Sequence, residues 1–491
     1  MSRSSLRALL LTLSLVPLAA LRAEDPSPAA AAPDAPALTV EACIARALEQ
    51  NFSLKIQGFS TTIAQESLLA AEARFEPEFT ATTQRSMVQS SLAERRNLTD
   101  TRLGVGQTLA SGALVNLSTS LDRAGYTPLL GTPNPAYSSD LSLSVTQPLL
   151  RGAGSAVNRA GIERSKLGLS IAHLGYKGSV LQVIRDTEAA YYNLVFTRGQ
   201  LAVKQHSLLL AQRLYDENKA RRSTGVATDL DVLTAEVGVA TARSGVVTAE
   251  QEMHNSEDAL LALTGHVEFN TRIGAVQLPA PPETPASFAR SYQLARESQP
   301  GLKATEAAIK QFELDAATAK NSALPTLNLG GAVGYNGTDR SYGSALDQAT
   351  SGEARNWQLD LSLSIPWGLH GDRARYRGAL AGLRQEQASL QQIDQTLVVN
   401  VRTAVRAVET SEQRVGIFSQ ATELAVKQYE LQLARFKAGL ATSRQVLETQ
   451  DDLESARVNE LQARVSFHTA LSYLHALDGS SLERYHVALA E

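Results

Sequence analysis

Two kinds of hydrophobic pattern alternate along this chain. Apolar and polar residues alternate strictly over 357–367, with Trp357 and Trp367 at the two ends. The same period of two recurs in three other segments, 140–146, 326–335 and, more weakly, 78–83. A period of two predicts β-strands with one apolar and one polar face.

The rest of the chain has the spacing of helices. Segment 158–223 contains no proline, and it predicts one helix of ~100 Å. Segments 229–264 and 443–478 predict helices of roughly 50–55 Å. Helices of this length cannot be buried in a compact globule, so the pattern favours an extended antiparallel helical tube.

Two sharp breaks separate the long helices from the shorter ones that follow. Gly225 and Gly439 are placed as the C′ residues at which the first helices end. Thr228 and Thr442 follow as the N-caps of the next helices. Each break therefore predicts the tip of a helical hairpin.

The two halves of the chain are related by a tandem duplication. Residues 215–265 match residues 429–479 without gaps, with 16 identities over 51 positions. Farther upstream the offset between the halves changes, so the first half carries 30 extra residues near its strands. These residues alternate on both sides of Ala110-Ser111-Gly112 and predict an added hairpin near 101–122.

The predicted organisation follows from the duplication, the strands and two proline-rich stretches. It is a signal peptide over 1–23, a Pro/Ala-rich linker over 24–38, a first-repeat helix over 39–75, first-repeat strands over 76–150, a helical hairpin over 151–265 with its tip at 224–228, a Pro-rich linker over 266–286, second-repeat helices over 287–323, second-repeat strands over 324–367, a helical hairpin over 368–478 with its tip at 438–442, and a C-terminal tail over 479–491.

The apolar strand faces fit either a soluble sandwich or a transmembrane barrel. The ten residues from Trp357 to Trp367 span ~33 Å along a strand. At a barrel tilt this covers ~25 Å of height, the lipid band of an outer-membrane barrel with aromatic girdles. The barrel is therefore favoured, and strands from several chains would have to close it together.

The N-terminus and the composition narrow the class of protein further. Residues 1–23 join an arginine-containing start to an apolar stretch, which predicts a secretory signal peptide rather than a membrane anchor. Lys and Arg number 46 against 50 Asp and Glu, a net charge of −4, so no basic excess points to nucleic acid. The single cysteine, Cys43, excludes an internal disulfide and predicts an inert apolar residue.

Catalytic chemistry finds no support in the sequence. The motifs GxSxG, HExxH, GxGxxG and the Walker loop are all absent. His468 and His475 lie seven residues apart, but no carboxylate lies four residues from either to complete a ligand set. We expect no enzyme activity, no cofactor and no metal.

Four features together resemble the TolC-like outer membrane factor family. Segment 38–51 resembles the family's first-helix motif, and Gly225–Leu233 resembles its G-x-x-T-x-x-D-V-L turn. Gly439–Leu447 repeats that turn, and 357–367 resembles the last strand of the family. The resemblance extends over nearly the whole chain after residue 23.

The resemblance implies a mixed α+β fold and an assembly. Duplicated long α-helical hairpins form a trimeric periplasmic α-barrel, and the strands contribute to a shared outer-membrane β-barrel of 12 strands. The implied function is that of the outer membrane channel of a tripartite efflux pump or type I secretion system. The implied partners are two further copies, a periplasmic adaptor (membrane fusion) protein, an inner-membrane transporter and outer-membrane lipid. The alternative is a periplasmic coiled-coil scaffold or adaptor without a pore.

The resemblance also implies positions for functional residues. The periplasmic aperture would be lined by Asp231, Gln445 and Glu448, and threefold symmetry would make each acid a ring of like charges that favours cations. Asp229 and Arg444 are the expected gate ion pair. For the acids the competing explanation is local, because the helix dipole favours acids in a first turn.

Other residues fall into two groups. The tip turns and the adaptor-docking surface are expected to comprise Gly225, Thr228, Gly439, Thr442, Arg221 and Arg435. The membrane-interface aromatics are expected to be Trp357, Trp367 and Tyr335. The basic residues have a local explanation too, since cations are favoured at helix C-termini.

The added hairpin departs from the family pattern. It would either enter the barrel, which gives 18 strands for a trimer, or lie at the outer mouth. The clean alternation on both arms favours the barrel.

Overall fold

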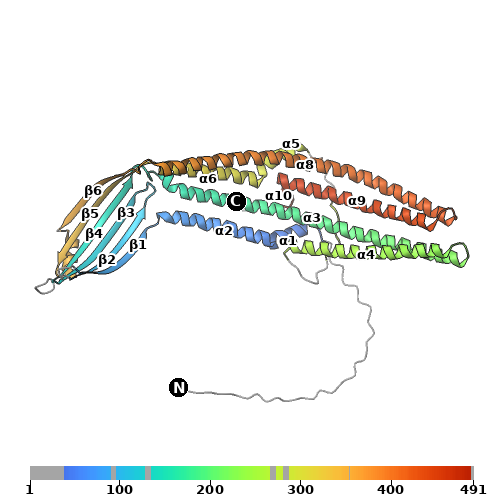
Figure 1. Ribbon diagram of the computed structural model, residues 1–491, viewed down its shortest axis with the longest axis horizontal. Coiled ribbons are helices and arrows are strands. Elements are labelled where there is room, and N and C mark those ends of the chain that lie inside the picture. The colour runs from blue at the N-terminus through green and yellow to red at the C-terminus, as the bar shows by residue number, and fades with distance from the viewer. Residues whose placement is uncertain are drawn as a thin grey trace, which may run out of the picture.

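The computed structural model describes residues 38–89, 95–127, 134–265, 273–279, 287–352 and 354–487. The predicted signal peptide lies outside these residues. Figure 1 shows an elongated chain with a sheet at one end, from which long helices extend to two tips at the other end. The predicted mixed α+β architecture with two long helical hairpins is confirmed.

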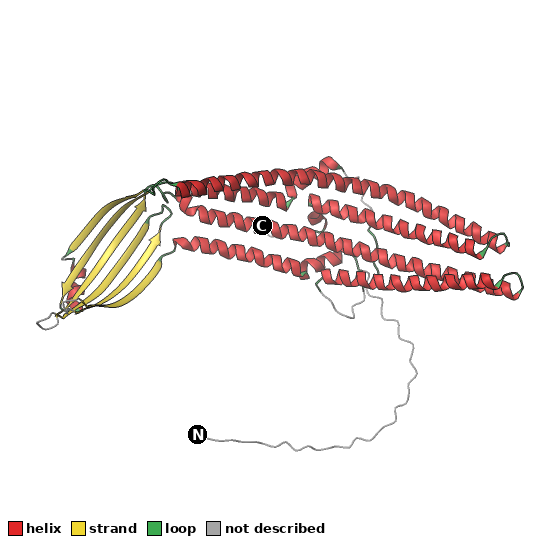
Figure 2. Cartoon of the chain, in the orientation of Figure 1, coloured by secondary structure: helices red, strands yellow, loops and turns green. Residues whose placement is uncertain are grey.

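In the described part of the chain, six strands form one antiparallel sheet in chain order (Figure 2). The strands are β1 (Glu78–Gln89), β2 (Arg95–Thr108), β3 (Leu114–Thr127), β4 (Asn134–Pro148), β5 (Thr326–Asp339) and β6 (Arg355–Ser364). Segments far apart in sequence meet where β4 pairs with β5. The sheet ends in β1 on one side and β6 on the other.

The two faces of the sheet differ in polarity across all six strands. One row of cross-strand neighbours consists of Phe79, Val105, Leu117, Leu143, Val333 and Trp357. The adjacent row of cross-strand neighbours lies on the opposite face and consists of Thr80, Gly104, Ser118, Ser142, Gly334 and Asn356. The predicted separation into an apolar and a polar face is confirmed.

β2 and β3 are the two arms of the added hairpin. Their turn lies at the end of the sheet that faces the helices, where the Leu109 N–H donates to the Ala113 carbonyl at 2.7 Å. Gly112 has φ +91°, and a Cβ there would lie 2.4 Å from the Gly152 carbonyl oxygen. Glycine is required at this position by both the backbone angle and the close approach.

Two features of β5 and β6 differ from the prediction. β6 ends at Ser364, three residues short of the predicted strand end. Pro366 has no N–H to donate to a strand, and Trp367 lies in the turn before the next helix. Between β5 and β6 lies an unpredicted helix, α7 (Tyr342–Ser351), which packs on the apolar face of the sheet over Gly337.

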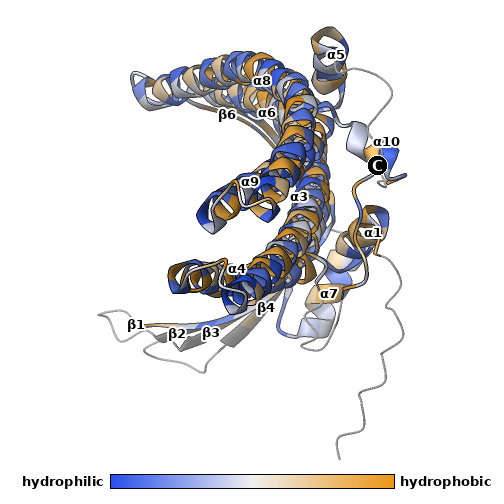
Figure 3. Cartoon of the chain, turned by 90° about the vertical axis from the view of Figure 1, so that its right-hand side faces the viewer, coloured by the Kyte–Doolittle hydropathy of each residue, from blue (hydrophilic) through white to orange (hydrophobic). Residues whose placement is uncertain are grey.

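The helices lie in a curved layer that continues the sheet. Their bounds are α1 (Val40–Gln50), α2 (Phe52–Glu72), η1 (Ala73–Phe75), α3 (Ser155–Ser223), α4 (Asp229–Leu263), α5 (Phe288–Ser298), α6 (Pro300–Ser322), α8 (His370–Lys437), α9 (Ser443–Asp478) and α10 (Ser480–Arg484). Near the sheet the lateral order is α2–α3–α6–α8, and near the tips it is α4–α3–α9–α8. Figure 3 shows this layer as an arc, with α1, α5 and α10 on its convex side.

The main core lies midway along the helical part. α1 buries Cys43 and Ile44 against the middle of α3, where Ile184 and Leu194 have no exposed surface. Burial raises the pKa of the Cys43 thiol to about 11, so the thiol stays protonated and unreactive. Across the described residues, no helix is long and apolar enough to cross a bilayer.

Candidate functional site at the helical tips

Both hairpin tips use the same backbone turn. Gly225 and Gly439 have φ +80° and +78°. A Cβ at either position would meet nothing within 4 Å, so the left-handed backbone rather than a close neighbour requires glycine. Both residues lie one position beyond the C-cap, as predicted.

A capping box starts each of the two shorter helices. Thr228 Oγ1 accepts from the Asp231 N–H at 3.2 Å, and Asp231 Oδ2 accepts from the Thr228 N–H at 3.0 Å. In the second tip, Thr442 Oγ1 accepts from the Gln445 N–H at 3.4 Å, and Gln445 Oε1 accepts from the Thr442 N–H at 3.0 Å. Both threonines are therefore N-caps, as their spacing predicts.

Asp231 and Gln445 occupy the same position in the duplication and make the same backbone contact. Hydrogen bonds from the Thr228 side chain and backbone N–H lower the pKa of Asp231. The cap needs an acceptor oxygen at this position, and the amide of Gln445 shows that the acceptor carries no obligatory charge. The helix-start explanation thus accounts for the position of Asp231, and a role for its charge has to be tested separately.

The expected gate pair, Asp229 with Arg444, is not formed within the described chain. Asp229 instead pairs with Arg222 across its own turn, at 2.5 Å between Oδ1 and Nε. Arg444 pairs with Glu448 one helical turn along α9, at 3.0 Å. Both pairs are largely exposed, so each contributes little to stability, and these side chains remain accessible to a neighbouring chain.

Arg221 joins the two tips to each other. Its Nη1 donates to the Phe436 carbonyl oxygen at 2.8 Å, and its guanidinium lies over the Phe436 ring, 4.6 Å from the centroid. The equivalent residue, Arg435, is exposed, and its Nη1 lies 3.5 Å from Gln432 Oε1. Of the two predicted docking arginines, Arg435 is the one available to a partner.

A buried polar contact that sequence reasoning missed lies one turn from Arg221. Ser443 Oγ donates to Asn218 Oδ1 at 2.9 Å, and Asn218 Nδ2 donates to the Leu214 carbonyl at 2.9 Å. Both side chains are nearly inaccessible. The contact links α3 to α9, and because the two residues lie 225 positions apart, no local signal could have paired them.

The three aromatic residues predicted for the membrane interface are exposed at the sheet end of the molecule. Trp357 is 78% and Trp367 102% exposed, and Tyr335 is 44% exposed. Trp357 lies opposite Val333 on the apolar face, and Tyr335 lies two residues farther along β5 on that face. Large aromatic side chains left this open are expected at a lipid boundary.

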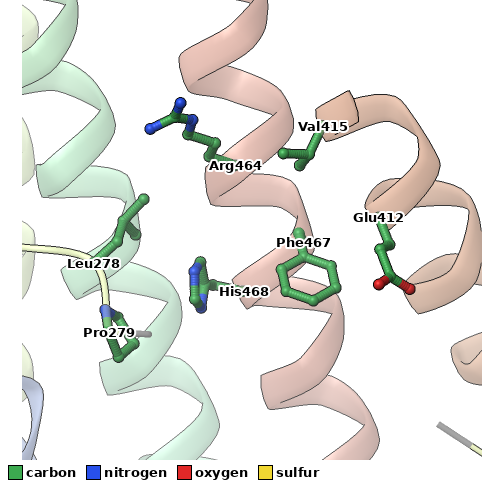
Figure 4. A pocket seen from close by; sticks show the side chains of 7 residues that line it. All are labelled: Leu278, Pro279, Glu412, Val415, Arg464, Phe467 and His468. Atoms are coloured by element: carbon green, nitrogen blue, oxygen red, sulfur yellow. The ribbon is translucent and has the colours of Figure 1, made fainter. Parts of the chain in front are cut away.

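A pocket of about 440 Å³ lies midway along the helices (Figure 4). Leu278 and Pro279 form one side, and α8 and α9 form the other. Burial, with a smaller contribution from Arg484, lowers the pKa of His468 in this pocket to about 4. The imidazole is therefore neutral at pH 7, and Arg464 is engaged by Glu460 at 2.6 Å.

These pocket residues do not form a catalytic constellation. His468 lies against Tyr192, with ring centroids 5.5 Å apart, as part of the helix packing. Nowhere in the described ranges do three or more histidine, cysteine or acidic side chains gather in a way that could hold a metal ion. The tips, where charge and accessible side chains converge, are the better candidate site.

Comparison with known proteins gives one family match and a set of similar folds. The profile of the outer membrane efflux protein family matches residues 43–266 and 291–480. The chain is 26% identical over 360 residues to the pyoverdine export outer membrane protein OpmQ of Pseudomonas putida, covering 68% of this chain and 70% of that protein.

Two solved structures with a similar fold are outer-membrane proteins. The CmeC outer membrane channel of Campylobacter jejuni has a TM-score of 0.69 at 16% identity, covering 90% of this chain and 86% of that one. The outer membrane protein VceC of Vibrio cholerae has a TM-score of 0.67 at 16% identity, covering 89% and 96%.

Proposed function

The chain belongs to the outer membrane efflux protein family, and on that premise we propose that three copies form one channel whose helical tips are its periplasmic entrance. The protein is an outer-membrane efflux channel that extends into the periplasm. Its family and fold are those of transport channels, and the proposal assigns the chain no catalytic step and no cofactor.

The sheet carries the argument for assembly. Among the described strands, β1 and β6 each have one unpaired edge, although both are long strands with exposed apolar side chains. Backbone groups at such edges cannot remain unpaired in lipid. Pairing β6 of one chain with β1 of the next satisfies both edges, and a ring of three closes the barrel.

The helices support the same closure. Near the sheet α2 is one lateral edge of the helical layer and α8 the other, and near the tips α4 and α8 are the edges. These edge helices expose apolar side chains at spacings of three, four or seven residues. The exposed residues are Phe52, Ile56, Phe59 and Ile63 on α2, Leu230, Leu233 and Val237 on α4, and Ile417, Leu424 and Leu431 on α8. Such spacing suits a coiled-coil contact with a neighbouring copy.

The tips are proposed as a cation-favouring aperture. Three copies would place three Asp231 and three Glu448 carboxylates around one axis, with three uncharged Gln445 side chains at the position equivalent to Asp231. Asp229 and Arg444 are proposed to pair between neighbouring chains. Closure of the ring would bring the α8 edge of one chain beside the α4 edge of the next, and Arg444 lies exposed on α9, the helix next to α8.

The proposed transport partners follow from the passive nature of the proposed channel. A passive channel needs an energy source elsewhere, so an inner-membrane transporter is proposed to drive cargo through it. A periplasmic adaptor is proposed to couple the two at the tips, where Arg435 and the turns around Gly225 and Gly439 are exposed. The export of pyoverdine by the similar protein OpmQ suggests a small secreted molecule as the first cargo to test.

Single-channel conductance of the purified protein in a planar bilayer tests the proposal. We expect a small, steady, cation-selective conductance. Asp231→Gln combined with Glu448→Gln keeps the capping acceptor at 231 and removes two rings of charge, so it should lower cation selectivity. Ser419→Gln, at an exposed position of α8, is the control and should change neither the conductance nor the cation selectivity.

Two outcomes would contradict parts of the proposal. Unchanged cation selectivity in the double variant would refute the acidic aperture, but it would not contradict the proposed channel. A wild-type protein that neither conducts nor fractionates with the outer membrane would return the choice to the scaffold without a pore.

A further inference from the structure

The added hairpin of β2 and β3 bears on the width of the exit. We infer that it is part of the barrel wall, so that a trimer closes a barrel of eighteen strands that is as wide as its helical tube. The inference rests on the proposed trimer. It concerns cargo size, because the width of the membrane section then no longer limits what leaves.

Strand pairing places the hairpin inside the sheet. β1 pairs with β2 along its whole length, from Glu78 opposite Gly106 to Gln89 opposite Arg95. β3 pairs with β4 from Leu114 opposite Thr146 to Tyr126 opposite Asn134. No direct β1–β4 pairing is present in the described strands. A hairpin placed at the outer mouth would instead leave β1 beside β4.

The hairpin also continues both faces of the wall. Val105 and Leu117 extend the apolar row between Phe79 and Leu143, and Leu117 is 48% exposed. On the other face Ser118 Oγ lies 3.0 Å from Ser142 Oγ of β4. The same separation of lipid-facing and lumen-facing residues therefore crosses all six strands without a break.

The turn of the hairpin is fastened to the helices. The Gly154 N–H, at the start of α3, donates to the Ser111 carbonyl at 3.0 Å. Gln107 Nε2 donates to the Phe75 carbonyl at 3.0 Å, and Ser111 Oγ donates to Gln147 Oε1 at 3.2 Å. These contacts fix the hairpin at the junction of sheet and helices, at the opposite end from an outer mouth.

The widths of the two layers agree only with six strands. Near the sheet each chain has four helices side by side, which at about 8–10 Å apart span about 32–40 Å. Strands about 4.8 Å apart, tilted by about 40°, each occupy about 6.3 Å of the circumference. Six strands then span about 38 Å and four only about 25 Å. The hairpin therefore removes the narrowing that a four-strand sheet would impose below the helices.

Disulfide cross-linking in the outer membrane tests the hairpin's position in the assembled channel. In a Cys43→Ser background, Thr83→Cys with Thr101→Cys joins β1 to β2, where the two hydroxyls lie 3.0 Å apart. Ser118→Cys with Ser142→Cys joins β3 to β4. We expect both pairs to cross-link under mild oxidation.

The duplication supplies a matched pair that excludes the alternative. Gly330 and Asp360 lie opposite each other in β5 and β6, and their first-repeat equivalents are Thr82 and Ser142. In the six-stranded sheet these two positions lie three strands apart, at least about 14 Å. Thr82→Cys with Ser142→Cys should therefore stay reduced. Cross-linking of this pair, with no cross-linking of the other two, would place the hairpin outside the wall and overturn the inference.

Polymer exclusion provides the second measurement. Deleting Arg95–Thr127 removes β2 and β3 and leaves β1 antiparallel to β4. The largest polymer admitted from the barrel side should then fall by roughly one third in radius. An unchanged cut-off in a deletion variant that conducts would overturn the inference and leave the proposed channel intact. A wild-type protein that neither conducts nor fractionates with the outer membrane would instead overturn the proposed function, and the eighteen-strand barrel with it.

Discussion

At the residue scale, Asp231 has one observed role, the cap of α4, and one proposed role, a charge in the aperture, and one substitution can separate the two. Asp231→Ala removes the acceptor of the Thr228 N–H and should destabilise the tip by about 1 kcal/mol. Asp231→Gln copies the second repeat, in which Gln445 makes the same bond at 3.0 Å, so it should keep the wild-type melting temperature. Thermal unfolding of the two variants side by side checks this, and equal losses in both would mean that the charge itself holds the turn.

The lowered pKa of Asp231 also sets an acid dependence. A carboxylate whose folded pKa lies below its unfolded value, about 3.9, stabilises the fold above that value. This stabilisation is lost as pH falls through the folded pKa. Hydrogen exchange at the start of α4 should therefore quicken, after correction for intrinsic rates, below about pH 4 in the wild type. Asp231→Gln should lack the added step, and a step of the same size in that variant would assign it to another group.

Arg221 tests how the two tips are held together. Arg221→Ala removes the bond to the Phe436 carbonyl and the ring contact, and should cost about 2 kcal/mol in the stability of the tips. Arg435→Ala, at the equivalent position, loses only a 3.5 Å contact and should leave the stability close to wild type. Hydrogen exchange in residues 214–235 measures both, and equal protection in the two variants would contradict the assigned contact.

At the element scale, the packing of α7 depends on a single glycine. A Cβ at Gly337 would lie 2.1 Å from the Ala345 carbonyl oxygen, which is backbone and cannot swing away. Gly337→Ala should therefore displace α7, at about 1–3 kcal/mol, and make Tyr342–Ser351 sensitive to protease added from outside. Gly331→Ala, on the same face of β5 with nothing within 4 Å, is the control. Equal protease resistance in both variants would refute the contact.

Local patterns were sufficient where the decisive interactions are local. The turn at Gly225, the cap at Thr228 and the alternation in β5 all depend on residues a few positions apart, so the sequence predicted them. The end of β6 at Ser364 was missed because alternation continues through Ile365 to Trp367, whereas Pro366 ends the pairing. α7 was missed because its buried residues are two alanines, Ala345 and Ala349, which are too small to mark an apolar helix face in the sequence.

The candidate site was less predictable than the turns that carry it. Motif position led to the proposal of Asp231 and Glu448 for the aperture, and it did not show that Asp231 caps its own helix. Arg221 was assigned to a partner protein because Phe436, 215 residues away, gives no sequence signal of contact. The contact between Ser443 and Asn218 forms only when the two hairpins pack against each other, so it cannot be predicted from local sequence.

At the scale of the whole molecule, closure should depend on the apolar edges of the helical layer. Leu424 of α8 is 59% exposed in one chain, and Leu424→Asp would bury a charge against the neighbouring copy. The trimer should dissociate into smaller species in detergent, with loss of conductance. Ser419→Asp, on a different face of α8, should remain trimeric. Sedimentation of both variants in detergent measures their oligomeric state. An intact Leu424→Asp trimer would show that Leu424 does not lie in the interface between copies.

The two open edges of the sheet have a genetic consequence. A subunit with a damaged β1 can still pair through its intact β6 with the β1 of a neighbouring copy. It would therefore join a trimer whose barrel cannot close. Mixed expression of sound and damaged copies in equal amounts would then leave only about one ring in eight built of sound subunits alone. Mutations at these edges should therefore be dominant, and a defective allele would silence much of its normal counterpart.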